Sequence, residues 1–267
     1  GVAQYKKLWS KGYPNSIGMM YSAMTDRVGL KPMDEEYILM GMAAYGRPRI
    51  ANRMASHYIE CLPDLEFKWN FHTGVDDAKF VKDASDEDIA ASAQVLCETL
   101  IQNVMLKARS IGKSTNLVYG GGVALNCLAN RLLGKFFDNI WIMPNPGDAG
   151  NSLGAAALGY GKRINWQDAF LGHLIPGKYP INKTISELRK NQMVGVASGR
   201  AEFGPRALGN RSLLADPRGS DIKDKVNEIK RRQKFRPFAP VILEEHVLGY
   251  FNMPHGWHDS RYMQVIA

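Results

Sequence analysis

The chain has 267 residues, 45% of them hydrophobic and 22% charged, a composition typical of folded domains and unlike that of disordered or fibrous proteins. Its formal net charge is +8, and no run approaches the roughly 18 consecutive apolar residues of a membrane-spanning helix, so we expect no membrane partner. The three cysteines, Cys61, Cys97 and Cys127, lie far apart without metal or redox spacing, which is typical of buried thiols in the cytoplasm.

Helical periodicity dominates the first part of the chain. Apolar residues recur on one face of residues 16–28, and Asp34 is expected to cap a second helix over 35–44. A long helix is expected over 86–111, because its first turn carries three acidic residues where the helix dipole favours them. Residues 63–83 mix aromatic and charged side chains without a period, so we expect an irregular insert there.

The pattern then changes to short strands that alternate with glycine loops and helices. Strands are expected over 116–119 and 139–143, with a helix over 125–133 between them. A second helix, over 149–161, is rich in small residues and suits close packing on a sheet. This alternation predicts an α/β domain. The aperiodic residues 164–182 form the expected linker to a second domain, which opens with a helix and a strand.

Glycine-rich loops follow both strands. In GGGVALN (120–126), glycines allow a phosphate to approach backbone N–H groups at a helix N-terminus, although a tight turn without a ligand has the same sequence. In PNPGDAG (144–150), Asp148 is either a helix cap or a metal or nucleotide ligand. Because open α/β sheets bind ligands at strand ends, the two loops together favour a nucleotide site.

Three arginines, Arg200, Arg206 and Arg211, lie among turn-forming glycines directly after the expected strand of the second domain. The apolar neighbours of Arg206 and Arg211 indicate that these two guanidinium groups are partly buried and need a fixed anionic partner. Glu202 and Asp216 are alternative partners within the chain. A phosphate or carboxylate ligand suits the paired donors of arginine equally well, so the segment predicts an anion site.

Basic residues concentrate in the same region. From Lys183 to Ala267 there are 15 Lys and Arg against 9 Asp and Glu, whereas the first 182 residues carry 19 against 17. This asymmetry favours a polyanionic ligand at one site, although a nucleic-acid-binding face would give the same balance. The last residues, 261–267, read as the beginning of a strand, and the chain opens at Gly1 without methionine. We therefore expect a piece of a longer polypeptide.

Four segments in this order resemble the O-carbamoyltransferases of antibiotic and nodulation-factor biosynthesis. They are EEYILMGMAAYGRP (35–48), GGVALNC with IWIMPNPGDAGNSLGAAAL (121–127 and 140–158), GRAEFGPRALGNRSLLADP (199–217) and KRRQKFRPFAP (230–240). The resemblance implies an α/β fold: the second half of an actin-like (ASKHA) ATPase-type domain, similar to threonylcarbamoyltransferases, over 1–163. After the linker 164–182, it implies the start of a threonylcarbamoyl-AMP-synthase-like α/β domain over 183–267.

The resemblance also implies a chemistry. Carbamoyl phosphate and ATP give carbamoyl-AMP and pyrophosphate in the second domain, and the first domain passes the carbamoyl group to an acceptor hydroxyl on a small molecule or sugar. A divalent metal, typically iron, assists the transfer, and magnesium accompanies ATP. The alternatives are an acceptor that is a hydroxymethylated nucleobase or a tRNA, and a non-catalytic nucleic-acid-binding module. A homodimer is compatible with each of these functions.

Site residues follow from the resemblance position by position. Asp148 matches the family's metal-ligand aspartate, and Arg206 and Arg232 are the expected catalytic residues. The nucleotide-binding loop is matched by Gly120, Gly121, Gly122 and Asn126. Carbamoyl phosphate and the ATP phosphates are expected to contact Arg200, Arg206, Arg211, Lys225, Lys230, Arg231, Arg232 and Arg236. The histidine pair that completes the family's metal site has no counterpart in the chain, nor does the remainder of the synthase-like domain.

Overall fold

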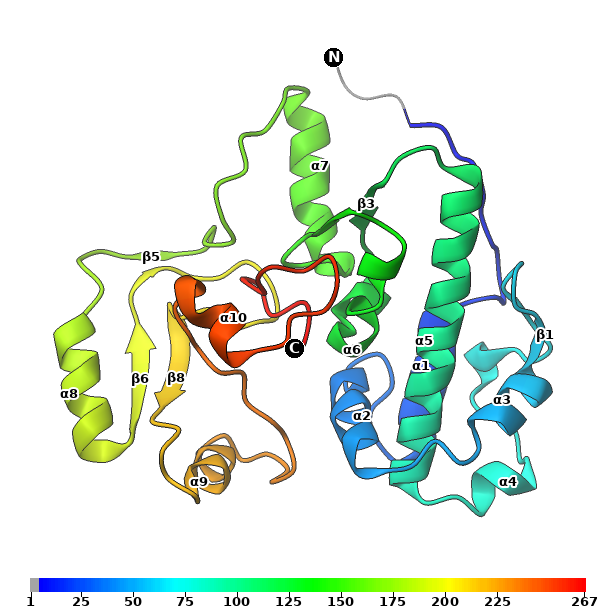
Figure 1. The fold of residues 1–267 in the computed structure, drawn as a ribbon, viewed down its shortest axis with the longest axis horizontal. Coiled ribbons are helices and arrows are strands. Elements are labelled where there is room, and N and C mark those ends of the chain that lie inside the picture. Colours follow the sequence, from blue (N-terminus) through cyan, green and yellow to red (C-terminus); the bar gives the residue numbers. More distant parts are fainter. Residues whose placement is uncertain (1–4) are drawn as a thin grey trace.

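The computed structural model describes residues 5–267 (Figure 1). Its helices are α1 (Ile17–Arg27), α2 (Glu36–Met42), α3 (Ala51–Tyr58), α4 (Lys79–Lys82), α5 (Asp86–Ile111), α6 (Cys127–Asn130), α7 (Asn151–Tyr160), α8 (Ile181–Asn191), α9 (Ile222–Ile229) and α10 (Val247–Tyr250). Its strands are β1 (Ile59–Cys61), β2 (Glu66–Phe67), β3 (Asn116–Tyr119), β4 (Asn139–Ile142), β5 (Leu174–Ile175), β6 (Met193–Ala197), β7 (Gly199–Arg200) and β8 (Arg211–Ala215).

The core of the first half is built around α5. Its first turn carries the three predicted acidic residues, and Ser85 caps it by accepting a hydrogen bond from Asp88 N. The helices α1, α2 and α3 pack on α5 and bury Met20, Leu39 and Met54 completely. By length and composition α5 alone among the described helices is apolar enough to cross a membrane, and 61% of its most apolar stretch is buried inside the fold. The predicted long helix is therefore confirmed as the central element of this half.

The N-terminus of α2 differs from the prediction. Asp34 does not cap the helix, because its carboxylate pairs with Lys31 at 2.8 Å. The two glutamates that follow organise the turn instead: Glu35 accepts from Lys31 N at 2.8 Å and Glu36 accepts from Met33 N at 2.6 Å. The predicted irregular insert is partly regular: it contains α4 and β2, which pairs with the preceding β1, and its Phe71 is buried in the core.

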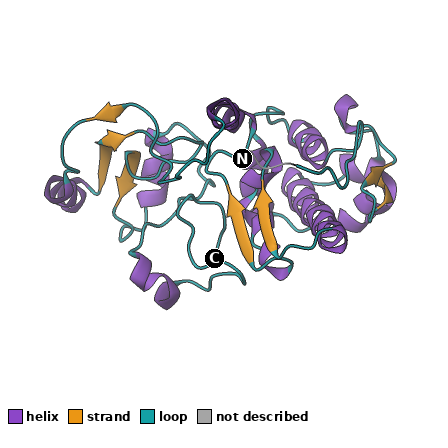
Figure 2. Ribbon diagram, turned by 90° about the horizontal axis from the view of Figure 1, so that it is seen from above, coloured by secondary structure: helices purple, strands orange, loops and turns teal. Residues whose placement is uncertain are grey.

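The strands β3 and β4 form a parallel pair in register from Asn116↔Asn139 to Tyr119↔Ile142. Figure 2 shows this pair between the helices of the first half and the strands of the second half. The helix expected over 125–133 is broken into the 3₁₀ turn Gly122–Leu125, α6 and the 3₁₀ turn Leu133–Lys135. The helix α7 contains no buried residue, so the expected close packing on a sheet is not present within residues 5–267.

The second half contains the antiparallel pair β6–β8, with α8 packed beside β6. The expected linker contributes β5, which pairs with β7 through Leu174↔Arg200. The strand expected over 261–267 does not form, because these residues are held by side-chain hydrogen bonds instead: Gln264 Nε2 donates to the carbonyls of Ile142 and Met143, both at 2.8 Å. The architecture is thus a mixed α/β fold with small sheets.

Candidate anion-binding site

The two glycine loops meet at one edge of the β3–β4 pair, because parallel strands end on the same side. Gly121 N donates to Pro146 O at 2.7 Å, and a Cβ added to Gly147 would lie 4.0 Å from Gly122 Cα. Gly121 has a φ of +97°, which favours glycine. The exposed residues Gly120, Gly121 and Gly122 leave open space above this edge, since a Cβ on the last two would meet no atom within 4 Å.

Asp148 begins the 3₁₀ turn Asp148–Gly150 at the same edge, with an exposed side chain. The cap position belongs to Gly147, so the helix-cap alternative does not hold. Within residues 5–267, no three or more His, Cys, Asp or Glu side chains gather where a metal ion would need them. The described residues therefore do not by themselves complete a site with the three protein ligands typical of a catalytic transition metal, and metal binding by Asp148 stays a prediction.

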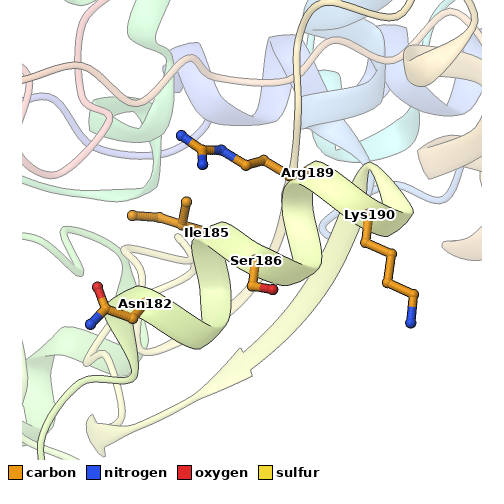
Figure 3. A pocket seen from close by; sticks show the side chains of 5 residues that line it. All are labelled: Asn182, Ile185, Ser186, Arg189 and Lys190. Atoms are coloured by element: carbon orange, nitrogen blue, oxygen red, sulfur yellow. The ribbon is translucent and has the colours of Figure 1, made fainter.

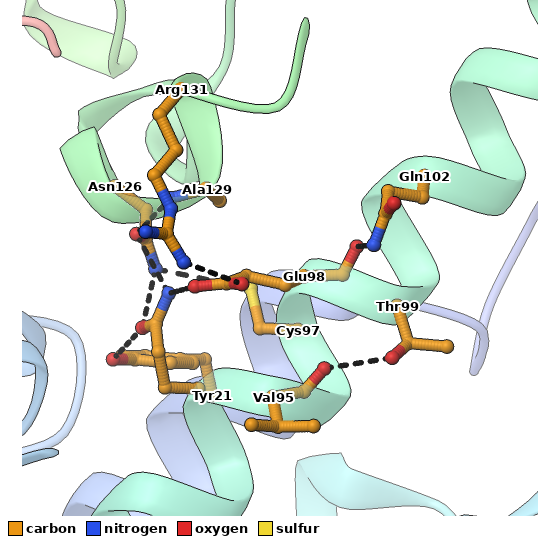
Figure 4. Close-up of polar contacts among 10 residues, drawn as sticks. Tyr21, Val95, Cys97, Glu98, Thr99, Gln102, Asn126, Ala129 and Arg131 are labelled. Carbon is orange, nitrogen blue, oxygen red and sulfur yellow. Dashed lines mark hydrogen bonds and ion pairs between the residues drawn. The ribbon is translucent and has the colours of Figure 1, made fainter. Parts of the chain in front are cut away.

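Asn126, expected in the nucleotide loop, is instead buried beneath it (Figure 4). Its Oδ1 accepts from Ala129 N at 3.0 Å and caps α6, while its Nδ2 donates to Gln94 Oε1 at 3.0 Å. The buried Gln94 also accepts from the Tyr21 hydroxyl at 2.8 Å. Every contact described for the Asn126 side chain is thus internal, and the residue supports the glycine loop rather than facing a ligand.

The arginine loop, residues 199–211, is organised around the Glu202 carboxylate. Glu202 Oε1 accepts from the backbone N–H groups of Leu208, Asn210 and Arg211 at 2.8, 2.9 and 3.2 Å. Burial opposes ionisation of this carboxyl, but the backbone donors outweigh burial and lower its pKa. The loop contacts the glycine edge at Gly204, where a Cβ would lie 2.7 Å from Pro144 O.

The three arginines of this loop have different surroundings. Arg206 reaches the glycine edge, where Nη2 donates to Leu125 O at 3.2 Å. Arg211 is committed to the backbone, donating to the carbonyls of Ser198 at 2.9 Å, Asn210 at 2.7 Å and His173 at 2.9 Å. Arg200 is exposed and donates to a carbonyl of the expected linker, that of Gly172, at 3.3 Å.

Neither of the alternative internal partners neutralises these arginines. Asp216 pairs with Arg218 at 2.5 Å, and Glu202 accepts backbone hydrogen bonds only, within the described residues. Of the three arginines, Arg206 is the one whose side chain reaches the glycine edge, and the structure records one hydrogen bond from it.

The second basic cluster follows α9 as a turn of residues 230–236, here named the cationic loop. Its anchor is Asn227, which is fully buried. Asn227 Nδ2 donates to the carbonyls of Lys234 at 3.0 Å and Arg236 at 3.1 Å, and Oδ1 accepts from Arg232 Nε at 2.6 Å. The Arg232 guanidinium also lies 4.4 Å from the centre of the Phe238 ring. One buried amide therefore fixes the backbone and one guanidinium of this loop.

The cationic loop faces α2 across a hollow of about 500 Å³. The guanidinium of Arg236 lies 4.6 Å from the centre of the Tyr37 ring on α2. Within residues 5–267, no carboxylate lies within ion-pair distance of Lys230, Arg231, Arg232 or Arg236. Burial and the neighbouring charge of Arg236 lower the pKa of Arg232. The lining residues are Glu35, Tyr37, Ile38, Lys230, Arg231, Arg232, Gln233 and Arg236.

The residues predicted to bind phosphate therefore divide into groups. Four share the hollow, Arg206 lies at the glycine edge, and Lys225 pairs with Asp221 at 2.8 Å. A second hollow of about 490 Å³ lies along α8 and is lined by that helix alone (Figure 3). It contains none of the predicted site residues.

Sequence reasoning missed the contribution of α2 to the hollow. Tyr37 and Glu35 lie nearly 200 positions before the cationic loop, so no spacing along the chain relates them. Asn227 is likewise absent from the predicted site residues. The one available signal for α2 was its membership of the four segments that carry the resemblance.

Two family models match this chain. The family model described as carbamoyltransferase N-terminus matches residues 2–157, and the model described as carbamoyltransferase C-terminus matches residues 185–267. An uncharacterized protein of Synechocystis, sll1178, is 33% identical over 97% of this chain and 50% of its own length. Nodulation protein NolO of Bradyrhizobium diazoefficiens is 30% identical over 95% of this chain and 53% of its own.

Nodulation protein U of Sinorhizobium fredii is 35% identical over 62% of this chain and 33% of its own length. The chain spans about half the length of the first two relatives. The two family models together cover both the glycine edge and the cationic loop. The chain belongs to the carbamoyltransferase family.

Proposed function

We propose that this chain forms part of an O-carbamoyltransferase in which the cationic loop holds the phosphates of carbamoyl phosphate and ATP. The family assignment supports carbamoyl transfer. The observation that carries the phosphate assignment is the hollow, where four cations converge without a carboxylate partner among the described residues. Guanidinium groups bind phosphate through paired, charge-assisted hydrogen bonds, which makes a polyanionic ligand the best match to this site.

In the proposed first stage, carbamoyl phosphate, ATP and water give carbamoyl-AMP, pyrophosphate and phosphate. Water cleaves carbamoyl phosphate to carbamate and phosphate. A carbamate oxygen then bonds to the α-phosphorus of ATP while the bond from that phosphorus to the bridging oxygen of pyrophosphate breaks. Negative charge accumulates on phosphate oxygens during this exchange, so positioned cations stabilise the transition state more than the ground state.

In the proposed second stage, the acceptor hydroxyl oxygen attacks the carbamoyl carbon, loses its proton, and AMP departs. The open glycine edge, with Gly120, Gly121 and Gly122, is the surface that we assign to the nucleotide in this stage. Arg206 lies at this edge and joins it to the second half through Leu125 O. Arg232, which contacts both Asn227 and the Phe238 ring, is assigned to the first stage.

Pyrophosphate release tests the proposal. The complete polypeptide, given carbamoyl phosphate and labelled ATP, is expected to release pyrophosphate only when both substrates are present. Arg232→Ala is expected to reduce this rate by about 10²–10³-fold, on the scale of one transition-state hydrogen-bond donor. Arg218→Ala is the matched control, because Arg218 is exposed and pairs with Asp216 outside the hollow. Equal rates for Arg232→Ala and the control, or no pyrophosphate from the wild type, would overturn the proposal.

A further inference from the structure

The segment 35–45, which covers α2 and the 3₁₀ turn Ala43–Tyr45, has no part in the proposed function so far. It belongs to the first half, yet its side chains meet the cationic loop of the second half. In Figure 1 the chain after α9 runs toward α2. The contacts at this meeting point come from three positions spaced along the segment: Tyr37, Gly41 and Tyr45.

Tyr45 makes the polar contact. Its hydroxyl donates to Phe235 O at 3.0 Å and accepts from Lys223 Nζ at 3.4 Å. The two aromatic rings of Tyr45 and Phe235 meet edge to face, with centroids 5.8 Å apart. One hydroxyl therefore ties the backbone of the cationic loop to α9, which carries Lys223, and to the first half.

Tyr37 and Gly41 make the remaining contacts. The Tyr37 ring lies beside the guanidinium of Arg236 at 4.6 Å, a distance suited to a cation–π interaction. A Cβ on Gly41 would lie 3.8 Å from the Phe235 ring, so the helix approaches the loop closely at this point.

The two partners differ in how they are held. The segment is anchored by Ile38 and Leu39, which are 2% and 0% exposed in the core. The cationic loop carries like charges that repel one another, and Arg231 within it has a φ of +49°, a conformation that costs free energy in a non-glycine residue. A rigid partner that fixes such a loop lowers the conformational cost of binding a ligand.

We propose that residues 35–45 are a positioning element of the anion site, with Tyr45 holding the cationic loop and Tyr37 holding the Arg236 guanidinium for a ligand of the diphosphate class. This proposal rests on the proposed function, because it presumes that the hollow binds phosphates. It adds that the first half shapes a binding site whose four cations, Lys230, Arg231, Arg232 and Arg236, come from the second half.

Calorimetric titration with pyrophosphate tests the proposal. Tyr45→Phe removes one hydroxyl and is expected to weaken pyrophosphate binding roughly two- to tenfold, the range for one hydrogen bond. Tyr250→Phe is the matched control, because Tyr250 is 77% exposed and its hydroxyl contacts no described residue. Tyr37→Leu, also at an exposed position, is expected to weaken binding about two- to fivefold through loss of the cation–π contact.

A double variant separates positioning from a general loss of structure. In an Arg236→Ala, Arg232→Ala background the cationic loop has lost its main ligands, so Tyr45→Phe is expected to have no further effect on pyrophosphate binding. If Arg232→Ala abolishes binding while Tyr45→Phe binds as tightly as Tyr250→Phe, the positioning proposal is wrong and the proposed function stands. If Tyr45→Phe weakens pyrophosphate binding equally in the wild type and in the Arg236→Ala, Arg232→Ala background, the positioning proposal is also wrong. Failure of the wild type to bind pyrophosphate would overturn both.

Discussion

Replacing Asn227 with alanine is expected to disorganise the cationic loop. The asparagine is 0% exposed, and all three hydrogen bonds recorded for its side chain end on this loop. The substitution removes the donors to Lys234 O and Arg236 O and the acceptor for Arg232 Nε. It therefore tests whether one buried amide sets the geometry of the anion site.

The magnitude follows from these three bonds. Loss of the hydrogen bond to each backbone carbonyl costs about 1 kcal/mol, and loss of the hydrogen bond from the charged guanidinium costs about 1.5–3 kcal/mol. Their partners lie on a partly exposed loop and recover some hydration when the loop moves, which reduces the sum. We expect the free energy of unfolding to fall by about 2–3 kcal/mol and pyrophosphate binding to weaken by roughly tenfold or more, since Arg232 loses its orientation.

Urea denaturation and calorimetric titration measure the two effects on the same preparations. Asn191→Ala is the matched control, because Asn191 is exposed at the end of α8 and bonds only Glu187, at 2.7 Å. The control is expected to change stability by no more than about 0.5 kcal/mol. An Asn227→Ala protein that matches the control in both stability and pyrophosphate affinity would refute the reasoning.

Three further predictions concern the scaffold around the site. The pKa of Glu202 is lowered in the fold, so the stabilisation from its carboxylate is full above its usual pKa of about 4.3 and is lost as the pH falls through the lower folded value. Glu202→Gln should therefore make the stability to urea less dependent on pH below about pH 5, and an unchanged pH profile would contradict this. Gly46→Ala places a Cβ 1.9 Å from Glu87 O and should lower the free energy of unfolding by more than about 2 kcal/mol. A Cβ on the control Gly154→Ala meets no atom within 4 Å, so that variant should leave the stability unchanged or raise it by up to about 1 kcal/mol. Equal melting temperatures for the two variants would exclude the clash. Arg211→Lys should lower the free energy of unfolding by about 1–3 kcal/mol, because lysine lacks the planar guanidinium that donates to three carbonyls. The same variant should be cleaved faster within residues 168–211 in limited proteolysis. An unchanged cleavage rate would argue against this role of Arg211.

Local pattern was sufficient where an element depends on its own residues. The helices Ile17–Arg27 and Asp86–Ile111 appear where apolar periodicity and an acidic first turn predicted them, and the structure adds a serine cap to each. The strand Asn116–Tyr119 appears at its predicted bounds, and Asn139–Ile142 differs from its prediction by one residue. Apolar spacing and capping act within a few residues, so each of these signals is complete in the local sequence.

Local signals failed where a side chain had competing partners. Asp34 was a plausible cap by position, yet Lys31 binds it and two glutamates take over the turn. Asn126 lies in a glycine loop that suggested nucleotide binding, yet Gln94, 32 positions earlier, holds its amide in the interior. Such choices depend on which polar groups are brought together by packing, and a buried amide must satisfy its hydrogen bonds wherever partners exist.

By itself, the sequence determined the helical first half, the short strands with their glycine loops and the basic character of the last third. Tertiary structure alone decided how the cations divide: Arg211 to backbone carbonyls, Arg206 to the glycine edge, and four others to a hollow shared with Tyr37. The reason is physical. Charge and composition are properties of residues taken one by one, whereas a binding site is a set of distances between residues that only the packing of remote segments fixes.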